Sequence, residues 1–162
     1  MVRKLSLAGL AIITLLVTQV VASEPAITGH VEGLELCPES LCGAAFFIGK
    51  FTGRVNQRRA TGGFFVSINH DPLPAPGRSV NITGGDWTIR ANLRLFSGEV
   101  LGGTISNNGD NTFAVEAVLQ VTFGGSGEIF VRGELDHNQF PPTNNADLSQ
   151  PPALVTGETS SQ

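Results

Sequence analysis

Two histidines with an acidic neighbour are the side chains whose types and spacing could do chemistry. His70 precedes Asp71 at the end of one apolar run, and His137 follows Asp136 at the end of another. An imidazole and a carboxylate placed together can take up and return a proton, which is general acid–base chemistry. If both runs end at the same rim of a barrel, these four residues and Arg78 are the candidate catalytic residues of a small enzyme.

Other catalytic and ligand-binding patterns are weaker. The three histidines, His30 included, have no spacing typical of a metal site, so we expect no metal and no cofactor. The segment Gly124-Gly125-Ser126-Gly127 has the glycines of a nucleophile elbow but no helical segment after it. Carboxylates alternate with arginines on the polar strand faces, which is typical of a solvated exterior. The residues therefore favour a non-catalytic protein over an enzyme.

The two cysteines, Cys37 and Cys42, lie close together in the sequence. In an exported protein such a pair is most simply a disulfide that closes a small loop. Redox motifs usually place two residues between the thiols, and no nearby His or Cys completes a tetrahedral zinc site. The spacing predicts a structural disulfide between Cys37 and Cys42.

The N-terminal segment, residues 1–22, has the three parts of a secretory signal. Arg3 and Lys4 precede a long apolar stretch, and the small residue Ala22 ends it. This predicts cleavage after Ala22 and a secreted or periplasmic protein that has no stable membrane insertion afterwards. The alternative is an uncleaved anchor, because the apolar stretch is nearly long enough to span a bilayer.

The charge of the chain argues against a nucleic-acid partner. The formal net charge is −4 at pH 7, and removal of the signal takes two positive charges away. Binding to a phosphate backbone needs clustered Lys and Arg, but only Arg58 and Arg59 are adjacent after residue 22. Asn81-Ile82-Thr83 is a glycosylation sequon, and whether Asn81 is modified depends on the host.

Alternation of apolar and polar residues is the main evidence for the fold. From Trp87 to Leu95 the odd positions are apolar and the even ones are mostly polar, which predicts a strand with one buried face. Runs at 101–105, 113–123 and 129–135 keep this odd parity. Antiparallel neighbours that bury the same parity need connecting loops with an odd number of residues. The candidate loops are Ser97-Gly98-Glu99, the stretch around Asn108-Gly109-Asp110, and Gly124 to Glu128.

Weaker runs upstream bring the expected count to seven to nine strands. These runs are residues 31–36, 44–51, 64–69 and 80–83. No long segment after the signal has helical periodicity, and the prolines of residues 72–77 predict a loop. Consecutive hairpins favour an all-β antiparallel up-and-down meander that closes into a small β-barrel, because closure removes exposed edges. A two-sheet β-sandwich is the alternative.

The composition changes near the C-terminus. From Phe140 onwards the chain is rich in Pro, Asn, Ser and Thr. We therefore expect a single β domain over residues 23–139 and a tail over 140–162. A short strand at residues 153–156 would extend the domain.

Four apolar side chains interrupt the predicted polar faces: Phe65, Phe96, Val118 and Phe130. Aligned, they would form an apolar stripe on the outer wall that could receive the tail, a second protomer or a ligand. Scattered surface apolar residues are the alternative and are common in soluble proteins. An oligomer is compatible with the sequence but is not specified by it.

Three functions are compatible with these residues. The favoured one is a secreted, non-catalytic β-barrel module that binds a small apolar ligand or a protein partner, or has a structural role at a surface. The second is a small barrel enzyme, an isomerase, cyclase or hydrolase, with the rim site described above. The third is an inhibitor or adhesin that acts through the proline-rich loop 71–78, because a pre-ordered loop loses less entropy on binding.

Overall fold

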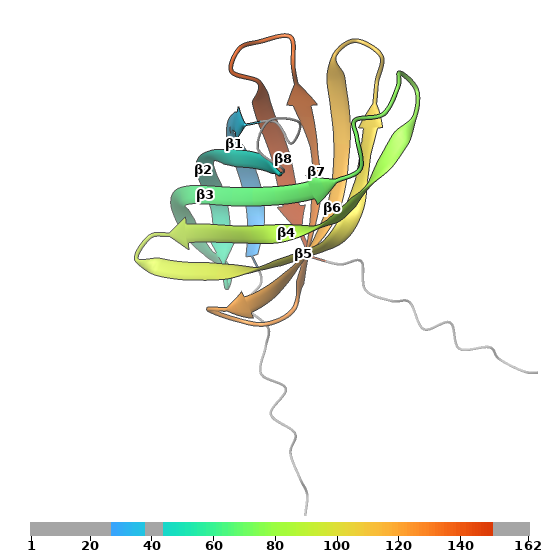
Figure 1. Ribbon diagram of the computed structural model, residues 1–162. Helices are drawn as coiled ribbons and strands as arrows, with labels where there is room; N and C mark the ends of the chain where they lie inside the picture. Colours follow the sequence, from blue (N-terminus) through green and yellow to red (C-terminus); the bar gives the residue numbers. More distant parts are fainter. Residues whose placement is uncertain (1–26, 38–43, 151–162) are drawn as a thin grey trace, which may run out of the picture.

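The computed structural model describes residues 27–37 and 44–150, and these form a closed antiparallel β-barrel (Figure 1). Its strands are β1 (Ile27–Cys37), β2 (Ala45–Val55), β3 (Arg58–His70), β4 (Ser79–Ala91), β5 (Arg94–Asn107), β6 (Thr112–Phe123), β7 (Glu128–Asp136) and β8 (Thr143–Ser149). Each strand pairs with the next in the chain, and β8 pairs with β1 to close the ring. The predicted up-and-down barrel is confirmed, with eight strands.

Three predictions fall on residues that are not described. They are the signal segment 1–22, the short strand at 153–156, and the disulfide, since Cys42 is not described. All three stay predictions. The described part of the chain has no helix that is long and apolar enough to cross a membrane.

The two ends of the barrel differ in their connections. At one end β2–β3, β4–β5 and β6–β7 are joined by the short turns 56–57, 92–93 and 124–127. At the other end lie the loops 71–78, 108–111 and 137–142. We call this second end the long-loop rim. In an up-and-down barrel the C-terminal ends of all odd-numbered strands lie at this rim. Both candidate histidines therefore lie there, because His70 ends β3 and His137 follows β7.

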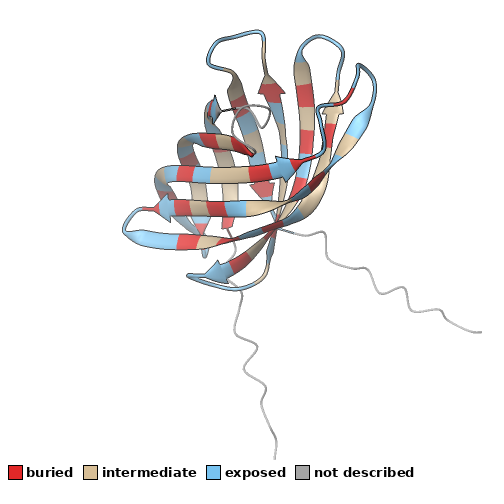
Figure 2. Ribbon diagram, in the orientation of Figure 1, coloured by how far each residue is buried: buried red, intermediate tan, exposed pale blue. Residues whose placement is uncertain are grey.

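Large side chains fill the half of the barrel near the short turns. Buried and exposed positions alternate along the strands (Figure 2). Phe51 and Phe96 are fully buried, and Trp87 is 2% exposed. The indole Nε1 of Trp87 donates a hydrogen bond to the backbone oxygen of Gln120 at 3.0 Å, so its polar atom is satisfied. These three large side chains of the core therefore lie in this half, and other side chains occupy the half near the long-loop rim.

The turn between β4 and β5 differs from the expectation. β4 ends at Ala91, and a two-residue turn follows in which Asn92 has a φ of 55°. Asn is one of the residues that tolerate positive φ, which explains the early turn. A continuous strand from Trp87 to Leu95 is therefore wrong, and so is a loop at Ser97-Gly98-Glu99, which lies within β5.

This short turn reverses the parity of the first half of β5. Ile89 pairs with Phe96, so an even-numbered residue faces inward. A shift in the register between Val100 and Gly102 then restores the odd parity, and Leu101 is half exposed at that bulge. Beyond it the predicted odd register holds, with Gly103 opposite Ala117. The last pair of these two strands is Asn107 and Phe113, and the five residues between them are an odd number.

The predicted outer stripe is wrong at Phe96, whose side chain is in the core. Val118 and Phe130 are half-buried partners on β6 and β7. Phe65 is 39% exposed on β3, beside Ile48 of β2. Three of the four residues thus face outward, but on two separate parts of the wall.

The barrel extends past the boundary that composition suggested at residue 139. β8 lies within the segment assigned to the tail, and it pairs with both β1 and β7. Its inward-facing residues include Asn144 and Leu148, both buried. Because β8 is short and carries few apolar residues, its pattern resembles that of a polar tail. The domain therefore includes residues up to Ser149.

The position of Phe96 gives the first prediction. We expect Phe96→Ala to lower the free energy of unfolding by about 3–5 kcal/mol, because it leaves a cavity in a packed core. Phe65→Ala is the matched control on the outer wall, and we expect a much smaller loss there. Urea unfolding followed by circular dichroism measures both values. Equal losses in the two variants would contradict the inward position of Phe96.

Candidate functional site

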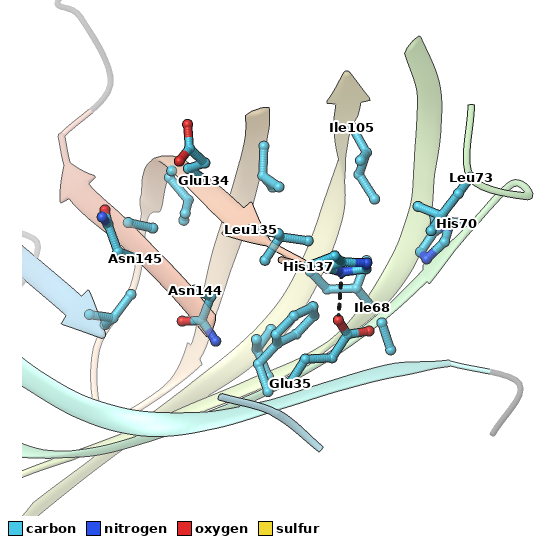
Figure 3. Close-up of a pocket in the computed structure, with 18 of the residues that line it drawn as sticks. Glu35, Ile68, His70, Leu73, Ile105, Glu134, Leu135, His137, Asn144 and Asn145 are labelled. Carbon is cyan, nitrogen blue, oxygen red and sulfur yellow. Dashed lines mark ion pairs between the residues drawn. The ribbon is translucent and has the colours of Figure 1, made fainter. Parts of the chain in front are cut away.

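The half of the barrel near the long-loop rim contains a cavity of about 470 Å³ (Figure 3). This volume is within the range of small-molecule sites. Pro72 and Leu73 of the loop after β3 lie where the cavity reaches the rim. Its wall is mostly apolar and is formed by Val31, Ala45, Phe47, Phe64, Val66, Ile68, Ile105, Val115, Val131, Leu135 and Ala146.

Small inward-facing residues explain why the barrel is hollow at this level. Gly133 of β7 is directly opposite Ala146 of β8, and both line the cavity. A Cβ atom at Gly133 would lie 2.3 Å from the Cβ atom of Ala146, so a larger residue does not fit there. Ala45 is a third small residue on the wall, near the start of β2. Small side chains on three strands leave space that large side chains fill elsewhere in the barrel.

The structure brings the two candidate histidines to the same cavity. His70 ends β3 and His137 follows β7, so both lie at the long-loop rim and both line the cavity. His70 is 8% exposed, and its ring Nδ1 contacts the backbone oxygen of Asp71. Since a carbonyl oxygen accepts, this contact favours the tautomer in which Nδ1 carries the proton.

The other three candidates do not line the cavity. Asp71 and Arg78 are exposed at the two ends of the loop between β3 and β4. Asp136 accepts a hydrogen bond from the backbone N of Asn138 at 2.8 Å, and another from the Gln139 side chain at 3.3 Å. The backbone bond from Asn138 is the main reason that the pKa of Asp136 is lowered. Asp136 therefore stays ionised and fixes the turn after β7.

A buried ion pair lies on the cavity wall. Glu35 Oε2 is 2.9 Å from His137 Nε2, and the side chains are 4% and 22% exposed (Figure 3). Glu35 comes from β1, and its backbone N donates a hydrogen bond to Pro142 O at 2.9 Å. The His137 ring packs on Phe113 with 4.9 Å between ring centres. Both partners are thus held in place by neighbouring elements.

Asn144 lies between the strands that carry this pair. It is directly opposite Gly33 of β1 and Leu135 of β7, so Glu35 and His137 are each two residues farther along a flanking strand. Residues in such diagonal positions on one face have Cβ atoms close enough for side chains to meet. We call Glu35, His137 and Asn144 the polar corner of the cavity.

The side-chain amide of Asn144 has an unused donor. Asn144 is 9% exposed, and its Nδ2 atom is buried with no hydrogen-bond partner in the part of the chain that the structure describes. A buried polar group without a partner typically costs about 1–3 kcal/mol. An unsatisfied buried group in a folded protein calls for an explanation, and this one lies on the wall of the cavity.

Glu35 and Asn144 were missed by reasoning from sequence. Glu35 lies at an odd position in line with Val31, so its place on the inner face could have been predicted from the alternation of the first run. Asn144 falls in the segment that was assigned to the tail. The sequence does not show that β8 closes the barrel, so it gives no reason to expect Asn144 to be buried and its neighbour Asn145 to be exposed.

Neither a cluster of metal-binding side chains in the described part of the chain nor similarity to another protein was found. Within residues 27–37 and 44–150, no group of three or more His, Cys, Asp or Glu side chains could hold a metal ion. No family model, curated protein or solved structure matches the chain. The cavity and its polar corner are therefore the features that bear on function.

The buried ion pair gives the second prediction. Removing one partner leaves an uncompensated charge, so we expect His137→Leu to lower the free energy of unfolding by about 3 kcal/mol at pH 7. The double variant Glu35→Gln and His137→Leu removes the buried carboxylate together with its partner and should recover a large part of that loss. Urea unfolding of the wild type, both single variants and the double variant measures the coupling. Purely additive losses would show that the two side chains do not interact.

Proposed function

We propose that this protein binds a small, mostly apolar molecule inside its barrel. The observation that carries the proposal is the apolar cavity of about 470 Å³ with a few polar groups gathered at one side. Small-molecule sites are typically concave and apolar, with a small number of polar groups that fix the orientation of the ligand. A leader segment like that of residues 1–22 would make it an exported binding protein.

The closed sheet supports this proposal energetically. The cavity wall consists of side chains on hydrogen-bonded strands of one ring, so little ordering is needed when a ligand enters. Transfer of apolar ligand surface from water contributes about 25 cal/mol for each Å² buried. Because the site is preformed, less of that contribution is lost to ordering of the protein.

The loop between β3 and β4 supports binding in the cavity more than a separate role as an inhibitor or adhesin. Asn107 Nδ2 donates a hydrogen bond to Pro74 O at 2.8 Å, and Gly77 N donates to Asn107 O at 2.8 Å. These bonds attach the loop to the end of β5. Because Pro72 and Leu73 line the cavity, the attached loop forms part of its mouth.

Filling the cavity gives the third prediction. Val66 is half buried and lines the cavity, so we expect Val66→Trp to occupy the ligand's space and weaken binding of N-phenylnaphthylamine at least tenfold. This neutral apolar dye fluoresces when it enters an apolar site, and a fluorescence titration gives its dissociation constant. Phe65→Trp introduces the same side chain on the outer wall and should bind the dye like the wild type. A folded Val66→Trp variant with unchanged affinity would contradict a site in the cavity.

A second candidate function is proton transfer on a bound ligand. The buried Glu35–His137 pair favours it, because a carboxylate beside an imidazole in an apolar cavity has the chemistry of a general base. In an isomerase of this kind, Glu35 would take a proton from a carbon next to a carbonyl group and return it to another carbon of the same molecule. The C–H bond at the α carbon would break, the β,γ double bond would shift to the α,β position through a dienolate, and a new C–H bond would form at the γ carbon. The same proton is removed and returned, so no cofactor would be required.

The isomerase candidate gives the fourth prediction. A β,γ-unsaturated ketone should be converted to its conjugated isomer, which absorbs in the ultraviolet, and Glu35→Gln should reduce this rate at least 100-fold if Glu35 is the base. Asp136→Asn is the matched control, since Asp136 does not line the cavity. A rate no faster than that of buffer would exclude this reaction while leaving ligand binding untouched.

A further inference from the structure

We propose that the cavity selects a neutral molecule that has an apolar body and one oxygen acceptor, a hydroxyl or a carbonyl, which binds to the Nδ2–H of Asn144. This inference rests on the proposed function and names the class of ligand that the site receives. It is carried by the polar corner and by the charges that line the cavity.

The unused donor of Asn144 defines what the ligand must supply. Its Nδ2 atom is buried and has no hydrogen-bond partner in the described structure. Glu35 Oε2 and His137 Nε2 are also buried and do not have the geometry of a hydrogen bond, but they lie 2.9 Å from one another as an ion pair. A purely apolar ligand would leave the Asn144 donor buried without a partner, and that state is costly. An oxygen acceptor on the ligand removes this cost.

The charges around the cavity exclude an acid as the preferred ligand. None of the described residues that line it is a Lys or an Arg, and the positive charge that His137 can carry is already opposed by Glu35. Binding sites for carboxylates usually supply an arginine, a lysine or several backbone donors. A ligand carboxylate at the polar corner would lie near the carboxylate of Glu35 without a cation of its own. The site therefore fits an uncharged oxygen.

The arrangement of the strands also fixes the orientation of the ligand. Asn144 lies on β8, between β1 and β7, while Phe64 and Val66 line the cavity from β3. Glu134 and Asn145 also border the cavity but are exposed, and Figure 3 shows their side chains directed away from the ion pair. The oxygen of the ligand is therefore placed at β8, and its apolar body extends toward β2 and β3.

The test compares three probes by NMR: octanol, octanoate and cyclohexane, which has no oxygen. In the wild type at pH 7, octanol should shift the side-chain NH₂ signal of Asn144 and the methyl signals of Val66 and Val131. Cyclohexane should shift the same methyl signals and leave the NH₂ signal in place. Titration of the methyl signals gives the affinities, and octanoate should bind at least tenfold more weakly than octanol.

Asn144→Leu tests the donor directly. It should weaken octanol binding about tenfold, which corresponds to one hydrogen bond, and should change cyclohexane binding less than twofold. Because the substitution replaces an unpaired buried amide with an apolar group of similar size, we expect the variant to fold. Asn69→Leu, on an exposed position of β3, is the matched control and should bind both probes like the wild type.

The outcomes separate the two proposals. Methyl shifts with octanol and cyclohexane, but unchanged octanol affinity in Asn144→Leu, would overturn the role of Asn144 and leave the binding cavity intact. Octanoate binding as tightly as octanol would overturn the preference for a neutral ligand in the wild type itself, without any variant. No methyl shift with either octanol or cyclohexane would overturn the cavity as a binding site, and this inference with it.

Discussion

The pairing of β8 with both β1 and β7 is the constraint on which the rest of the structure depends. Without it, the other strands would form an open sheet with two exposed edges. With it, the sheet becomes a ring and acquires an interior. The same pairing places Asn144 between the strands that carry Glu35 and His137, so ring closure also assembles the polar corner.

Closure alone does not produce a cavity, because a barrel of this size can be filled by side chains. Whether a cavity remains depends on how side-chain volume is distributed along the barrel axis. Phe51, Trp87 and Phe96 occupy the half near the short turns, and small residues such as Gly133 and Ala146 occupy the other half. The packed half can supply stability while the hollow half contributes less packing. The fold thus separates the residues that hold the barrel together from those available for a ligand.

Parity of the apolar residues predicted strands with one buried face, and consecutive hairpins then favoured a closed barrel over a two-sheet sandwich. Parity was also the source of the main local error. An alternating pattern reports which face is buried but not where the chain turns. At Asn92 the chain turns within what reads as one continuous strand, and the bulge after Val100 then cancels the change of parity. The two irregularities compensate, so later strands agreed with the prediction although Phe96 was assigned to the wrong face. Similarly, the convergence of His70 and His137 followed from strand direction, whereas the partner of His137 came from β1, distant in sequence.

The Glu35–His137 pair affects the electrostatic character of the cavity wall. When the imidazole carries its second proton, the two opposite charges neutralise one another and leave a dipole rather than a net charge on the wall. A dipole attracts a polar neutral group at short range and has little attraction for an ion, which loses more hydration energy when it is buried. An apolar cavity with a compensated pair and an unpaired amide is therefore suited to molecules that are poorly soluble yet not charged. Such molecules are the ones for which a closed protein interior offers the largest gain over water.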